Sequence, residues 1–97
     1  MAIETLEGIL EARGVVHGDY ADQARVAQNL KAMVTASPNW KSSSLTSVQR
    51  DAIEMILVKL SRILSGDPNH RDHWDDISGY ARLAADRVGG GLPIESE

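Results

Sequence analysis

Apolar residues recur along this chain at steps of three and four, which is the spacing of a helix and not of a strand. The pattern predicts four helices, over residues 3–13, 20–36, 46–64 and 72–88. No stretch of the sequence alternates apolar and polar residues with period two, so a sheet has no support. We therefore predict an all-α fold, a small bundle of about four helices in an up-and-down arrangement.

Residues that start or stop helices lie at the expected ends. Gly14 is suited to a left-handed cap after the first helix. Thr46 and Gln49 have the spacing of a capping box, in which each side chain bonds the other residue's backbone N–H. The run Gly66-Asp67-Pro68 ends the third helix, and Asp72 is the predicted N-cap of the fourth. The third helix is thus the most clearly delimited of the four.

The organisation predicted for the 97 residues is a single helical domain over 1–91, followed by a flexible C-terminal tail over 92–97. Residues 37–44, SPNWKSSS, are rich in turn formers and predict a connecting loop. Trp40 within this loop is predicted to be a lid or an anchor for the core.

The third and fourth helices each have one strongly apolar face, which we assign to the core. Its members are Ile53, Ile56, Leu57, Leu60, Ile63 and Leu64 on the third helix and Trp74, Ile77, Ala81, Ala84 and Val88 on the fourth. The opposite face of the third helix is charged, yet it also carries Met55 and Val58. These two are either scattered surface residues or the interface of a homodimer, which a domain this small would use to bury more area. The second interpretation is the one we adopt.

Composition narrows the function classes. The net charge of −4 argues against a broad phosphate-binding surface, and nucleic-acid binding would require Arg25, Lys31, Arg50 and Arg62 to share one face. The absence of cysteine excludes disulfides, thiol nucleophiles and thiolate metal sites. No membrane span and no signal peptide are recognisable, so we expect a cytoplasmic protein with no membrane partner.

Carboxylates and histidines gather before and within the fourth helix. Asp72 and Asp76 are one turn apart, which suits either a cation between them or simple capping of the helix start. His70 and His73 share a spacing of three, but a zinc site needs further ligands that this spacing does not supply. His73 is therefore expected to pack beside Trp74.

Two segments resemble a family of small phage and prophage proteins without an assigned activity. They are KLSRILSGDPN at residues 59–69 and HWDDISGYARLA at residues 73–84, and the stretch around residues 14–20 resembles the family's N-terminal part. The resemblance covers residues 6–88. It implies a protein that acts in the cytoplasm of a bacterial host.

A more distant resemblance is to the all-α nucleoside triphosphate pyrophosphohydrolases of the MazG and dUTPase type, which hold Mg²⁺ on carboxylates of two helices. It implies that Glu54, Asp72 and Asp76 are metal ligands and that Lys59 and Arg62 contact phosphate. The first acidic run of that pattern lacks one carboxylate here, and a histidine stands where the second begins with glutamate, so the cage for Mg²⁺ is incomplete.

Two functions follow as hypotheses. The first is a nucleotide-binding or degenerate pyrophosphohydrolase module with Mg²⁺ as its cofactor. The second is a non-enzymatic module that binds a host protein. Both hypotheses predict the same fold, and they differ in whether the carboxylates converge.

Overall fold

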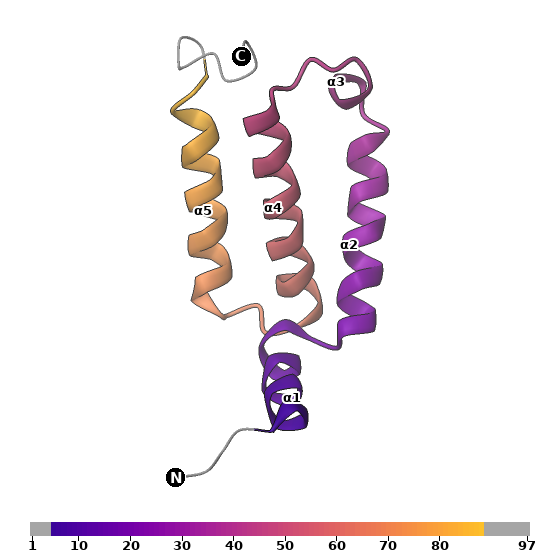
Figure 1. Ribbon diagram of the computed structural model, residues 1–97, viewed down its shortest axis with the longest axis vertical. Coiled ribbons are helices and arrows are strands. Elements are labelled where there is room, and N and C mark those ends of the chain that lie inside the picture. Colours follow the sequence, from indigo (N-terminus) through magenta and orange to yellow (C-terminus); the bar gives the residue numbers. More distant parts are fainter. Residues whose placement is uncertain (1–4, 89–97) are drawn as a thin grey trace.

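The computed structural model describes residues 5–88, which form helices and no strand (Figure 1). In chain order the helices are α1 (Leu6–His17), α2 (Tyr20–Thr35), α3 (Pro38–Lys41), α4 (Ser47–Ser65) and α5 (Arg71–Ala85). The all-α prediction and the four long helices are confirmed. None of the helices described is long and apolar enough to cross a membrane.

The predicted capping box at the start of α4 is present. The Thr46 hydroxyl accepts from the N–H of Gln49 at 3.1 Å, and the Gln49 side chain accepts from the N–H of Thr46 at 2.9 Å. Two backbone N–H groups at the helix start, which have no partner within the helix, are thereby satisfied. At the other end, the N–H of Gly66 donates to the carbonyl of Arg62 at 2.8 Å.

Replacing Thr46 with alanine is expected to lower the free energy of unfolding by about 1 kcal/mol, because it removes the acceptor for the Gln49 N–H. Urea denaturation followed by far-UV circular dichroism measures this. Thr46→Ser keeps the hydroxyl and is expected to stay within about 0.5 kcal/mol of the wild type. Equal losses in the two variants would show that the cap contributes nothing.

Three helix ends differ from the prediction. The first helix passes through Gly14 and ends before Gly18, whose φ of 89° and ψ of 174° define an extended, positive-φ conformation that glycine adopts most readily. The segment 37–44 contains the short helix α3, because Pro38 occupies its first position and tolerates helical geometry there. The last long helix starts after His70, so Asp72 lies in its first turn instead of capping it. The predicted tail over 92–97 lies outside the described residues.

Trp40 is held by an arginine of the central helix. The Arg50 guanidinium lies 4.7 Å from the centre of the Trp40 ring and donates to the Trp40 carbonyl at 2.8 Å. A cation over an indole face and a charged hydrogen bond both stabilise the contact. Trp40 therefore anchors α3 to the start of α4.

The long helices α2, α4 and α5 lie side by side, with α4 in the middle (Figure 1). α4 contacts both neighbours, whereas α2 and α5 make no contact with one another within residues 5–88. The buried residues of α4 reflect this arrangement: Leu57 and Ser61 lie on one side of the helix, and Ala52 and Ile63 on the other. The long helices form one layer, and α1 extends from one end of it.

This layer buries little of the predicted core. Ala52, Leu57 and Ile63 are the buried apolar residues of the described chain. Leu64 is 65% exposed, Trp74 51% and Val88 59%, and Ala81 is exposed as well, so the assignment of these four to the core is wrong for the single chain. The physical reason is that a helix in one layer is covered by its neighbours at its sides but not above or below.

Met55 and Val58 lie on the opposite side of α4 from Ile53, Ile56 and Leu60, and both are partly buried. The exposed carboxylates of Asp51 and Glu54 occupy the same side as Met55 and Val58. A dimer through Met55 and Val58 stays a prediction.

Candidate functional site

Two turns are pressed together at the end of the layer where α1 joins α2 and α4 joins α5. The N–H of Asp67 in the second turn donates to the carbonyl of Val16 in the first at 2.9 Å. Gly18 and Gly66 meet backbone to backbone, and a Cβ atom at either position would overlap the other turn. Both glycines are therefore required for this approach.

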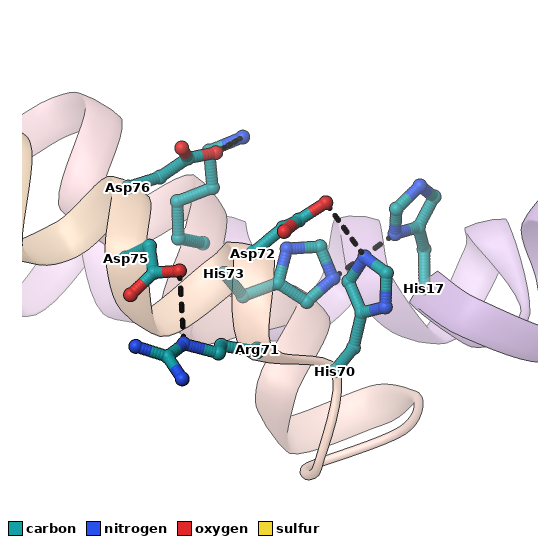
Figure 2. Close-up of polar contacts among 8 residues, drawn as sticks. His17, His70, Arg71, Asp72, His73, Asp75 and Asp76 are labelled. Atoms are coloured by element: carbon teal, nitrogen blue, oxygen red, sulfur yellow. Dashed lines mark hydrogen bonds and ion pairs between the residues drawn. The ribbon is translucent and has the colours of Figure 1, made fainter.

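Three histidines gather at this junction although His17 is 56 residues from His73 in sequence (Figure 2). His17 Nδ1 lies 3.1 Å from His73 Nε2, a hydrogen bond in which one ring donates and the other accepts. The ring centres of His70 and His73 are 4.7 Å apart, and those of His17 and His73 are 5.0 Å apart. His73 is only 2% exposed, and its Nδ1 is buried with no hydrogen-bond partner among the described residues.

This environment favours neutral imidazoles. Burial, reinforced by the positive charge of Arg62, lowers the pKa of His17 from 6.5 to about 4. Burial also lowers the pKa of His73, with His70, Arg62 and Lys59 acting in the same direction. The His17–His73 hydrogen bond requires an unprotonated acceptor nitrogen, which agrees with this direction. At neutral pH the pair is uncharged.

A cavity of about 550 Å³ opens beside His17, between α1, the start of α2 and the end of α4. Its lining combines cationic, polar and aromatic side chains: Leu10, Arg13, Gly14, His17, Gly18, Asp19, Tyr20, Gln23 and Arg62. Neither Arg13 nor Arg62 forms an ion pair with another residue of 5–88, and the Nε of Arg62 is buried without a hydrogen-bond partner. Two guanidinium groups without carboxylate partners are suited to binding an anion, although the carboxylate of Asp19 lines the same cavity.

Of the two predicted phosphate ligands, only Arg62 lines the cavity. The Lys59 ammonium lies 2.9 Å from the Asp76 carboxylate and its side chain is 14% exposed. This ion pair links α4 to α5. Lys59 is thus engaged with one of the predicted metal ligands.

The predicted metal ligands Glu54, Asp72 and Asp76 are not assembled around one point. Asp72 lies 3.7 Å from His70 Nε2, Asp76 bonds Lys59, and Glu54 is exposed on α4. In the part of the chain that the structure describes, no group of three or more His, Asp or Glu residues is placed to hold a metal ion. A magnesium site at these residues would require side chains to move, and it stays a prediction.

Sequence patterns alone did not indicate the histidine cluster or the cavity residues Arg13, Tyr20 and Gln23. Helical periodicity relates residues within one element, whereas these groups meet only when two distant turns pack together. The one local sequence signal for this junction is Gly18, because a glycine after a helix marks a turn. That turn places His17 at the junction.

The family comparison covers nearly the whole described chain. A family model described as "Domain of unknown function (DUF6378)" matches residues 4–88. No curated protein and no solved structure matches significantly. Since the match spans α1 to α5, the chain belongs to the DUF6378 family.

Proposed function

We propose that this protein binds a nucleotide in the cavity between α1, α2 and α4. The observation that carries the proposal is Arg62, which lines the cavity and forms no ion pair with another residue of 5–88. A phosphate oxygen in the cavity would accept a charged hydrogen bond from its guanidinium without displacing a carboxylate. Arg13 lines the same cavity and supplies a second cation for a phosphate chain.

The remaining lining suits the base and the sugar. The Tyr20 ring is 78% exposed at the cavity and offers an aromatic face on which a base can stack. Gln23 supplies an amide and Asp19 a carboxylate, both able to bond the edges of a base or a sugar hydroxyl. The volume of about 550 Å³ lies within the range of small-molecule sites. Phosphate, sugar and base therefore each have a complementary group.

Hydrolysis is the second part of the proposal and depends on Mg²⁺. The resemblance to MazG-type pyrophosphohydrolases assigns Glu54, Asp72 and Asp76 to the metal, but Asp76 is bonded to Lys59. Release of Lys59 toward a phosphate would free Asp76 for a cation. Without that rearrangement the protein binds nucleotide but does not cleave it.

The test is a calorimetric titration of nucleoside triphosphates and monophosphates, with and without Mg²⁺, accompanied by an assay of pyrophosphate release. Arg62→Gln is expected to weaken nucleotide binding at least tenfold, because a charged hydrogen bond to phosphate contributes about 1.5–3 kcal/mol. Arg25→Gln is the matched control, since Arg25 is exposed and pairs with Asp22 away from the cavity. Equal weakening in both variants, or no binding by the wild type, would refute the proposal.

The second candidate function is a non-enzymatic module that binds a host protein. The observation in its favour is the row of apolar side chains on α4 that its neighbours leave partly exposed. A phosphate-dependent signal in the titration would separate the two candidates, because an interaction module has no need for the unpaired Arg13 and Arg62.

A further inference from the structure

We infer that a second copy of this chain packs on one face of the helix layer, which forms a two-layer dimer. The inference goes beyond the nucleotide site, which lies at one end of the molecule. The surface concerned, here the apolar face, comprises Val26, Leu30 and Met33 of α2, Ile53, Ile56, Leu60 and Leu64 of α4, and Trp74 and Ala81 of α5.

The middle row of the apolar face lies on α4. Ile53, Ile56 and Leu60 follow one another at helical spacing, yet none of them is buried, and Leu64 is 65% exposed. These are residues that periodicity assigns to a core. A monomeric helix layer leaves them in contact with water, at a cost of about 25 cal/mol per Å².

The rows on α2 and α5 continue the same surface. Neighbouring helices run in opposite directions, so the side of each helix that flanks Ile56 can be found from the helical repeat of 3.6 residues. On α5 that side carries Trp74, which is 51% exposed, and Ala81. On α2 it carries Met33, which is 75% exposed, with Val26 and Leu30.

The opposite side of the layer carries more charged residues, although it is not free of apolar ones. There a cleft between α4 and α5 is lined by the charged Asp51 and Arg87 and also by Val48, Ala52, Tyr80 and Leu83. Glu54 and Asp76 are exposed on the same side. On the side of the apolar face, the exposed Asp22 lies one turn before Val26 on α2 and is paired with Arg25, so charge is sparser there than on the opposite side and opposes contact between two copies less.

The helix layer is large enough on one side to form a dimer interface. A 19-residue helix is about 28 Å long, and three helices at spacings of about 9 Å are about 27 Å wide. The footprint is then about 750 Å², close to the roughly 800 Å² that each partner buries in a stable interface. Domains normally consist of two packed layers around one core, and residues 5–88 supply one layer.

A second copy suits this face because the surface can be complementary to itself. Ile56 is at the midpoint of α4, the central helix, so a two-fold axis that crosses α4 there places Ile56 against the partner's Ile56 and Leu60 near the partner's Ile53. The apolar-face residues of α2 then contact the apolar-face residues of an outer helix, α2 or α5, of the other copy. Covering all three rows requires a surface as wide as the layer itself, which a second copy has.

The test begins with light scattering and sedimentation equilibrium at several concentrations. The wild type is expected at twice its 10.5 kDa. Leu60→Glu places a charge in the apolar face and is expected to raise the dimer dissociation constant at least a hundredfold. Val58→Glu is the matched control, because Val58 is also partly buried on α4 but lies on the opposite side. Dissociation by Val58→Glu and not by Leu60→Glu would overturn the assignment of this face.

A second pair of variants covers the case in which Leu60→Glu fails to fold. Met33 on the apolar face is 75% exposed and Leu83 on the opposite side is 50% exposed, so neither substitution disrupts a packed core. Met33→Glu is expected to give a folded monomer, and Leu83→Glu a dimer. A wild type of 10.5 kDa, or a dimeric Met33→Glu variant, would overturn the inference. Nucleotide binding by Met33→Glu, measured separately, reports on the cavity and not on the dimer.

Discussion

Replacing Gly66 with alanine is expected to lower the free energy of unfolding by about 3 kcal/mol or more. The new methyl group would overlap the backbone of His17 and Gly18 and the carbonyl of Val16, all of which belong to the opposing turn. Backbone atoms cannot rotate away as the end of a side chain can, so the two turns must separate. The N–H of Asp67, which bonds the Val16 carbonyl, would lose that partner as well. Urea denaturation at fixed protein concentration measures the loss.

The matched control is Gly79→Ala, which is expected to change stability in the opposite direction. Gly79 lies within α5, and a Cβ atom there meets nothing within 4 Å. Alanine is about 0.5–1 kcal/mol more favourable than glycine in a helix interior, so this variant is expected to be stabilised. If Gly66→Ala were as stable as Gly79→Ala, the two turns would not be in the contact described.

Local sequence signals predicted the helices well because the formation and the ends of a helix depend on residues that are close in sequence. The Thr46–Gln49 box and the glycine at position 66 set the ends of α4 correctly. The end of α1 was placed at Gly14, but a single glycine inside a helix costs only about 1 kcal/mol and the helix continues past it. Gly18 ends it because the turn there needs a positive φ.

The apolar pattern predicted which faces avoid water but not what covers them. Leu57 and Ile63 are buried as expected, whereas Leu64 and Trp74 of the same pattern are largely exposed. Periodicity reports the preference of a face, and it cannot distinguish a neighbour in the same chain from a second copy. This limit explains why part of the predicted core is exposed in the single chain.

The candidate site was predicted only at Arg62. Its other members depend on the meeting of two turns that are about 50 residues apart, which no local pattern encodes. Arg62 itself was singled out through a resemblance that paired it with Lys59, and the structure separates their roles: Lys59 bonds Asp76, whereas Arg62 lines the cavity.

Acidification is expected to destabilise the fold through the histidine pair. The pKa of His17 is about 4 in the folded state and 6.5 in its ordinary state, so the unfolded chain binds the proton first as pH falls. Stability is therefore complete above pH 6.5 and declines between pH 6.5 and 4. For His17 alone the loss from pH 7 to pH 5 is about 2 kcal/mol, and the lowered pKa of His73 adds a loss of the same sign. Urea denaturation at a series of pH values measures it.

The variant His17→Asn isolates this contribution, because asparagine can bond His73 Nε2 but does not titrate. Relative to its own stability at pH 7, the variant is expected to lose less than the wild type at pH 5, by about 2 kcal/mol. Carboxylates titrate equally in both proteins, so their effect cancels in the difference. Parallel pH profiles would mean that His17 is as easily protonated in the fold as in the unfolded chain.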